Sequence, residues 1–184
     1  MTGTVERGGL LRPLVRRLHA WRALRRARAE SRERLARVRP RRLLVVCYGN
    51  IYRSPFAAAV LSGVTGIEVR SAGFHPRVGR ETPAPFQEVV RRYGVDLSAH
   101  RSCALDPAIV AWADVVIVMD RHNWDRLKQD WPQVLPKVVW LGGFVDDGPV
   151  EIIDPYGRSV SDMQIIAERL HRACTCLVRT LSAA

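Results

Sequence analysis

The sequence predicts an α/β fold, a doubly wound, four-stranded parallel sheet with helices on both of its faces. Short apolar runs rich in β-branched residues alternate with helical patterns between residues 43 and 181, as is typical of this class. The runs are apolar throughout, which indicates strands covered on both faces. Cys47, Ser71 and Asp120 each follow or end such a run. Because ligands bind beyond the carboxyl ends of parallel strands, these three ends predict one shared site.

The first strand is expected at 43–46, where an apolar run leads directly into Cys47. A tight loop follows, and it contains Gly49 and Asn50, the residue types that most readily adopt left-handed backbone angles. Pro55 and the alanine-rich run after it predict that a helix begins there. A strand-to-helix turn of this kind gathers backbone N–H groups around one point, so we expect it to bind an anion.

The remaining elements continue the alternation of strands and helices. The expected strands are 67–71, 113–120 and 137–141, and the expected helices are 83–93, 123–129 and 160–181. Such an order favours right-handed crossovers that place helices on either side of one sheet.

Two reactive side chains border the loop, with Cys47 at its start and Arg53 at its end. A thiol that faces backbone amides and a guanidinium should ionise readily, because these groups stabilise the thiolate. Asp154 stands in an Asp-Pro-Tyr-Gly segment more than a hundred residues later. A carboxyl group on a proline-stiffened loop is suited to protonate a leaving oxygen.

The segment C-Y-G-N-I-Y-R-S-P, residues 47–55, resembles the phosphate loop of the low-molecular-weight protein tyrosine phosphatases. The Ser-Ala-Gly of 71–73, the segment 95–101 and the Asp-Pro-Tyr of 154–156 are similar to further parts of that family. The resemblance covers residues 43–181. It implies a phosphotyrosine protein phosphatase that acts on phosphoprotein substrates through a cysteinyl-phosphate intermediate, with neither cofactor nor metal.

The resemblance also implies a role for each site residue. Cys47 would be the nucleophile, Arg53 would bind the phosphate, and Asp154 would be the general acid. The implied substrate-binding residues are Tyr48, Gly49, Asn50, Ile51, Tyr52, Ser54 and Tyr156, while Ser71 and His100 would support the loop. Among these, Ser54 would hydrogen-bond the sulfur and ease its departure.

Three other functions remain open for the same fold. An arsenate reductase relays oxidation through additional cysteines, but residues 119–124 contain none and Tyr52 occupies the place of another candidate. Protein-arginine phosphatases tend to carry a small hydroxyl residue where this chain has Ile51. A phosphotyrosine-binding module without activity would not require the nucleophile, the arginine and the acid together.

Many relatives also have a second cysteine, able to protect the nucleophile, in place of Tyr52.

The net charge of +11 is concentrated in residues 1–42, which we call the N-terminal arm. The arm holds fourteen arginines and three glutamates, whereas residues 43–184, the expected phosphatase domain, are neutral overall. We expect the arm to be helical or partly disordered, and an apolar stripe that includes Leu18 and Trp21 could lie on an anionic membrane surface. A solvated extension is the simpler alternative for the arm, and binding of nucleic acid or an acidic partner is a third. Nucleic acid is not an expected partner of the domain, which carries no net charge.

The expected location is the cytoplasm, with peripheral membrane association as an alternative. The sequence has no apolar run of ~18 residues and no secretory signal pattern. Its four cysteines lack the paired spacing of a zinc site, and a reducing compartment would keep Cys47 as a thiol.

Overall fold

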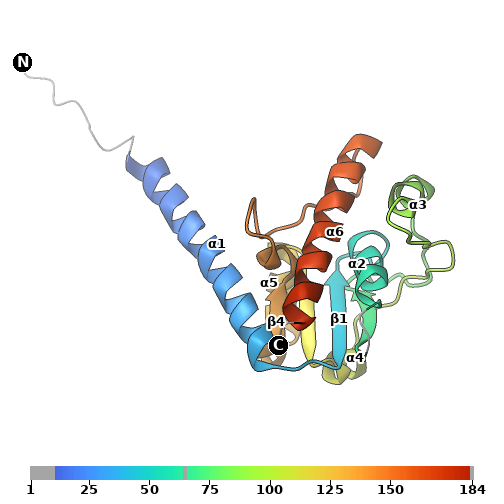
Figure 1. Ribbon diagram of the computed structural model, residues 1–184, viewed down its shortest axis with the longest axis horizontal. Helices are drawn as coiled ribbons and strands as arrows, with labels where there is room; N and C mark the ends of the chain where they lie inside the picture. The colour runs from blue at the N-terminus through green and yellow to red at the C-terminus, as the bar shows by residue number, and fades with distance from the viewer. Residues whose placement is uncertain (1–10, 64–65, 183–184) are drawn as a thin grey trace, which may run out of the picture.

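Four parallel strands form the centre of the structure (Figure 1). The computed structural model describes residues 11–63 and 66–182, without the side chains of 11–21, 23 and 24. The strands are β1 (Arg42–Cys47), β2 (Glu68–Gly73), β3 (Val115–Val118) and β4 (Val138–Trp140). Their order is β2-β1-β3-β4, and every neighbouring pair is parallel. The predicted doubly wound sheet is confirmed.

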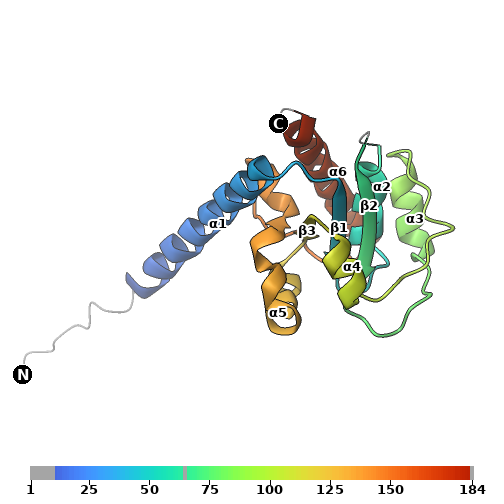
Figure 2. The same cartoon turned by 90° about the horizontal axis from the view of Figure 1, so that it is seen from below.

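Helices cover both faces of this sheet (Figure 2). The α-helices are α1 (Leu11–Arg37), α2 (Arg53–Leu61), α3 (Ala84–Arg91), α4 (Pro107–Trp112), α5 (Arg121–Asp130) and α6 (Val160–Ser182), and the 3-10 helices are η1 (Pro132–Lys137) and η2 (Leu141–Phe144). Leu43 and Val45 of β1 belong to a core cluster with α2, α3 and α6. Leu44 and Val46 point the other way, into a second cluster with α4 and α5, because side chains alternate along a strand.

Several helices differ from the expectation: α5 begins at Arg121, two residues before the predicted start at 123, and the short η1 and η2 were not expected. Helix α2 begins at Arg53, two residues earlier than predicted, because proline is accommodated within the first turn of a helix. Helix α4 was not predicted. It has six residues, and its N-terminus is capped by Asp106, which accepts a hydrogen bond from the backbone N–H of Ile109 at 2.8 Å. So short a helix leaves too few turns for a hydrophobic period to appear.

The last turns of α1 belong to the body of the protein, although the helix lies in the arm. Leu35 is 2% exposed and joins the core cluster with α2 and α6. The buried Ser31 hydroxyl accepts a hydrogen bond from the backbone N–H of Trp140 at 3.0 Å. Arg34 donates to the carbonyl of Val138 at 2.8 Å. The N-terminal half of α1 leads away from the domain (Figures 1 and 2), and the side chains of the proposed apolar stripe lie outside those described.

Truncations should therefore separate the two halves of the arm. Deleting residues 1–40 removes Leu35 and leaves the Trp140 N–H without its acceptor, which together should lower the free energy of unfolding by roughly 3 kcal/mol or more. Deleting residues 1–24 keeps both contacts and should change this free energy little. Urea unfolding of the two truncations measures the difference. Equal stability of both proteins would show that the end of α1 does not support the core.

Candidate active site

The phosphate loop, residues 47–53, connects the end of β1 to the start of α2. Asn50 has a φ of 51°, as its residue type predicts, whereas Gly49 does not adopt a positive φ. Gly73, at the end of β2, lies so close to the loop that an added Cβ would be 2.7 Å from the carbonyl oxygen of Tyr48 and 2.8 Å from the nitrogen of Asn50. The Ser-Ala-Gly segment therefore ends in glycine because the loop needs this space.

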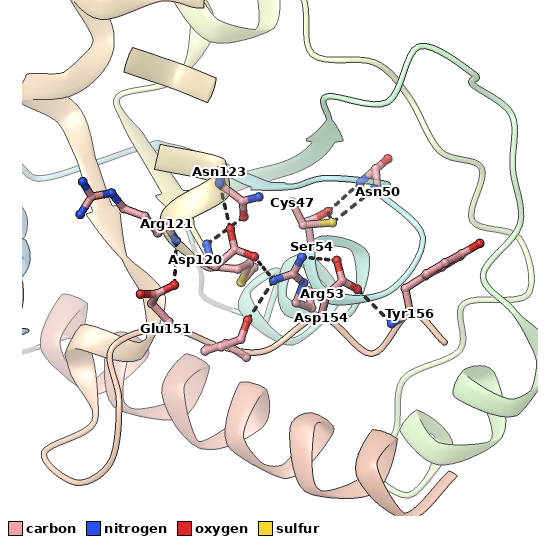
Figure 3. A network of polar contacts seen from close by, with 12 residues as sticks. Cys47, Asn50, Arg53, Ser54, Asp120, Arg121, Asn123, Glu151, Asp154 and Tyr156 are labelled. Carbon is pink, nitrogen blue, oxygen red and sulfur yellow. Dashed lines mark hydrogen bonds and ion pairs between the residues drawn. The ribbon is translucent and has the colours of Figure 1, made fainter. Parts of the chain in front are cut away.

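The sulfur of Cys47 is buried at the centre of the loop and accepts hydrogen bonds there (Figure 3). The backbone N–H of Asn50 donates to Sγ at 3.2 Å, and the hydroxyl of Ser54 lies 3.0 Å from it. Because Ser54 Oγ already accepts a hydrogen bond from the Asn50 side chain at 2.9 Å, its own proton is free to point at the sulfur. Both contacts favour a negatively charged sulfur.

Asn50 connects the loop to the neighbouring segments. Its Oδ1 accepts from the backbone N–H of Cys103 at 2.9 Å, which fixes the orientation of the amide. Its Nδ2 then donates to Ser54 and to the hydroxyl of Ser71, each at 2.9 Å. The carbonyl oxygen of Asn50 lies 2.8 Å from Nε2 of His100. Ser71 and His100 thus contact the residue with the strained backbone, in the arrangement expected of loop support.

Arg53 is 1% exposed and holds several acidic and carbonyl groups together. Nη1 donates to the carboxylate of Asp120 and to the carbonyl of Ile152 at 2.9 Å, while Nη2 pairs with Asp154 (Figure 3). Burial opposes the charged guanidinium, but Cys47, Asp154 and Asp120 outweigh it and raise the pKa of Arg53. Its Nε is buried without a hydrogen-bond partner among the described residues, so one donor remains for an incoming anion.

The loop that carries Asp154 is attached to the end of β3. The backbone N–H of Ile152 donates to the carbonyl of Met119 at 2.8 Å. Asp154 Oδ1 accepts from the backbone N–H of Tyr156 at 3.1 Å, which closes a tight turn around the proline. Tyr156 itself is 76% exposed. This carboxyl group, distant from the nucleophile in sequence, is thereby placed next to the same guanidinium.

A cleft of about 660 Å³ opens over the loop. Its lining consists of Cys47, Tyr48, Gly49, Ile51, Tyr52, His75, Arg80, Asp154, Tyr156, Gly157 and Arg158. The structure therefore brings the three predicted catalytic residues together and gathers most of the predicted substrate-binding residues around them. Asn50 and Ser54 do not line the cleft: both are buried, and they contact Cys47 and each other.

The sequence placed Asp120 at the shared site without a role for it, and it did not indicate Arg80 at all. Asp120 caps α5, because its Oδ1 accepts from the backbone N–H of Asn123 at 2.8 Å, and its other oxygen pairs with Arg53. The apolar run that ends at Asp120 was the feature of the sequence that indicated its place at the site. Arg80 lies in a segment without secondary structure and donates to the carbonyl of Gly49 at 2.6 Å. No local pattern predicts that contact.

The part of the chain that the structure describes holds no group of three or more His, Cys, Asp and Glu residues suited to a metal ion. In that same part, no helix has the length and apolar character to cross a membrane.

The side chain of Tyr52 is buried, and its ring packs edge-on against the ring of Phe86, with the ring centroids 5.2 Å apart. The described cysteines are all free thiols. Cys103 donates to the carbonyl of Ser71 at 3.0 Å, and burial followed by the nearby Asp106 raises its pKa. A smaller fraction of Cys103 is therefore present as the reactive thiolate near neutral pH than of an ordinary thiol.

Oxidation of Cys47 should consequently be poorly reversible. Without a neighbouring thiol at position 52, peroxide should carry the sulfur beyond the sulfenic acid. We expect little recovery of activity when dithiothreitol follows prolonged exposure to peroxide, and Tyr52→Cys should increase that recovery. Full recovery in the unaltered protein would mean that another cysteine, such as Cys103, protects the nucleophile.

A buried thiol in a loop between a strand and a helix, an arginine at the end of that loop and a nearby carboxyl group are the groups that cysteine-dependent phosphate transfer uses. A family model described as low molecular weight phosphotyrosine protein phosphatase matches residues 42–184. The chain belongs to this family, whose members are hydrolases acting on phosphomonoesters.

Individual relatives agree with this membership. A protein-arginine-phosphatase of Geobacillus stearothermophilus is 36% identical over 123 residues, which cover 66% of this chain and 82% of the relative. The probable low molecular weight protein-tyrosine-phosphatase EpsP of Ralstonia nicotianae is 32% identical, covering 77% of this chain and 96% of the relative. The crystal structure of the Erwinia amylovora tyrosine phosphatase AmsI superimposes with a TM-score of 0.73 at 28% identity, over 78% of this chain and 94% of the other.

Proposed function

We propose that this chain is a phosphotyrosine protein phosphatase that works through a phosphate ester of Cys47. The observation that carries the proposal is that Cys47 and Asp154 line one cleft beside the exposed ring of Tyr156, while the buried Arg53 pairs with Asp154 from beneath that lining. The buried arginine supplies a planar guanidinium that can bind two phosphate oxygens at once, a geometry that lysine does not offer. No metal is required, because the loop amides and this guanidinium can stabilise the charge of the transition state.

In the first step, the Cys47 thiolate attacks phosphorus opposite the leaving oxygen. The S–P bond forms, the P–O bond to the tyrosine breaks, and the protonated Asp154 donates its proton to the departing phenolate. In the second step, the Asp154 carboxylate takes a proton from water. That water attacks phosphorus, the S–P bond breaks and inorganic phosphate leaves. The Ser54 hydroxyl, 3.0 Å from Sγ, stabilises the sulfur as it regains negative charge.

Substrate binding should rearrange the partners of Arg53. Its Nη2 pairs with Asp154 in the structure described above, and its Nε has no partner among the described residues. A phosphate dianion over the loop can bind both nitrogens, which would release Asp154 toward the leaving oxygen. Asp120 pairs with Arg53 and caps the N-terminus of α5, and neither contact uses the nitrogens that the phosphate would bind. We therefore assign Asp120 the role of positioning the guanidinium.

Ile51 favours phosphotyrosine over phosphoarginine. Ile51 lines the cleft as an apolar side chain, whereas protein-arginine phosphatases tend to have a small hydroxyl residue at this place. An aliphatic side chain suits a phenyl ring but offers no hydrogen bond to a guanidinium, whose buried N–H groups would remain without acceptors. Protein-arginine phosphatase is the second candidate, because a relative with that name is 36% identical.

Arsenate reduction and binding without catalysis are less compatible with the site. Among the described cysteines, Cys47 alone lines the cleft, so no second thiol is available there to relay oxidation. A module that only binds phosphotyrosine has no use for the carboxyl group of Asp154 beside the phosphate site.

Turnover by the purified chain tests the proposal. Peptides of one sequence that carry phosphotyrosine, phosphoserine or phosphoarginine should be compared with a chelator present and absent. We expect phosphotyrosine to be hydrolysed fastest and the chelator to have no effect. The Ile51→Thr variant should have a smaller preference for phosphotyrosine. Faster release of phosphate from phosphoarginine by the unaltered protein would favour the second candidate instead. Hydrolysis of none of the three would contradict the proposal.

We further propose that the enzyme acts in the cytoplasm and that its arm binds an anionic membrane surface. The arm contributes the whole net charge of +11 together with an apolar stripe, and basic helices with tryptophan and leucine bind anionic lipid. The full chain should sediment with vesicles that contain phosphatidylserine at low salt, and less so as salt rises. Leu18→Ser with Trp21→Ser should weaken this binding. Absence of sedimentation at low salt would leave the arm as a solvated extension.

A further inference from the structure

Two arginines line the active-site cleft outside the phosphate loop. Arg80 lies on the segment before α3, and Arg158 follows Tyr156 on the Asp154 loop. Among the described residues of the lining, Asp154 is the one carboxylate, and its charge is already paired with Arg53. The mouth of the cleft therefore carries two positive charges beyond those that the phosphate and the general acid use.

Arg80 is held in place before any ligand binds. Its Nη2 donates to the carbonyl of Gly49 at 2.6 Å and its Nε to the carbonyl of Arg77 at 3.1 Å. The backbone N–H of Arg80 donates to the hydroxyl of Ser102 at 3.0 Å. These contacts are all to uncharged acceptors, so they orient the guanidinium without neutralising it. A fixed arginine loses less conformational entropy when it binds an anion than a free one does.

Arg158 is oriented in a similar way. Its Nε donates to the carbonyl of Asp154 at 2.8 Å, and its backbone N–H donates to that of Pro155 at 3.1 Å. The side chain is exposed, and no carboxylate of the described chain forms an ion pair with it. Many other arginines of the domain differ in this respect: Arg101, Arg121 and Arg126, for example, pair with Glu81, Asp125 and Asp130.

We propose that the preferred substrates carry aspartate or glutamate next to the phosphotyrosine, and that Arg80 and Arg158 read these flanking carboxylates. The inference rests on the proposed function of the site. The aromatic ring of the substrate would lie among the apolar and aromatic lining, including Tyr48 and Tyr156. The substrate residues on either side of the phosphotyrosine would then lie next to the two arginines. Exposed ion pairs of this kind alter affinity by roughly two- to fivefold each.

The experiment compares three phosphotyrosine peptides that differ in their flanks, which are aspartate, alanine or lysine. The full chain should hydrolyse them in that order of kcat/KM, with a ratio of about tenfold between the aspartate and lysine peptides from two such pairs. Arg80→Met and Arg158→Met should each reduce this ratio by roughly two- to fivefold, and Arg80→Glu should reduce it further. Added salt should reduce it as well.

Arg39→Met provides the matched control. Arg39 is exposed between α1 and β1, beyond the end of β1 opposite to Cys47, so its loss changes the net charge equally but should keep the ratio. p-Nitrophenyl phosphate, which has no flanking residues, reports on the catalytic site in every variant. Equal kcat/KM for the three peptides, or an equal drop in the ratio for Arg39→Met, would overturn the inference while the proposed function stands. Hydrolysis of p-nitrophenyl phosphate but of none of the peptides would contradict the proposed function instead.

Discussion

Replacing Cys47 with serine is expected to abolish turnover, with a loss of roughly 10⁴-fold or more in kcat. An alcohol is a far weaker acid and a far weaker nucleophile than a thiol, so the attacking group is lost although only one atom changes. The fold should survive, because a serine side chain fits the space of Cys47 and can accept the hydrogen bond from the N–H of Asn50. Initial rates on a phosphotyrosine peptide measure the loss, and urea unfolding checks the stability.

Cys103→Ser is the matched control for this experiment. The thiol of Cys103 donates to the carbonyl of Ser71, and this residue lies outside the lining of the cleft. Activity should largely persist in this variant. Substantial activity in the Cys47→Ser protein, or an equal loss in the Cys103→Ser protein, would be inconsistent with Cys47 as the nucleophile.

Replacing Asp154 with alanine is expected to lower kcat/KM for a phosphotyrosine peptide by roughly 10²- to 10³-fold. The same variant should lose much less activity on p-nitrophenyl phosphate, because nitrophenolate is a good leaving group and needs little protonation. The comparison uses kcat/KM, which reports the first chemical step even where the second limits kcat. The ratio between the two losses is therefore the quantity to measure.

Asp146→Ala controls for the removal of a carboxylate. Asp146 pairs with Arg32 of α1 at 2.7 Å and lies outside the lining of the cleft. The Asp146→Ala protein should show the same small change in kcat/KM on both substrates. Equal losses on the two substrates in Asp154→Ala would mean that Asp154 supports the site without donating a proton.

The sheet and the phosphate loop could be predicted because their determinants are local. Val115–Val118 is an uninterrupted apolar run, and such a run has few alternatives to a strand buried on both faces. Asn50 could be expected to adopt a positive φ, since its side chain tolerates that conformation. The nearness of Cys47 to Arg53, close enough for the sulfur to raise the pKa of the guanidinium, also follows from short spacing, because both residues border one turn.

Contacts between distant segments could not be predicted in the same way. Arg53 and Asp120 are 67 residues apart, and their ion pair depends on how β1 and β3 adjoin in the sheet. Arg80 contacts Gly49 from a segment without periodicity. The burial of Leu35 was hidden because it stands in a stretch of alanine, arginine and glutamate that reads as solvated. In each case the determinant is tertiary packing, which local patterns do not contain.

Trapping the covalent intermediate tests the central claim most directly. In the Asp154→Ala protein, the carboxylate that should activate water is absent, so the phosphate ester of Cys47 should break down slowly. Rapid acid quenching after addition of p-nitrophenyl phosphate, followed by proteolysis and mass spectrometry, locates the phosphate. We predict one phosphate on the sulfur of Cys47 and none in the protein that also carries Cys47→Ser. Phosphate on another residue, or turnover with no phosphate on Cys47 at any quench time, would contradict the account.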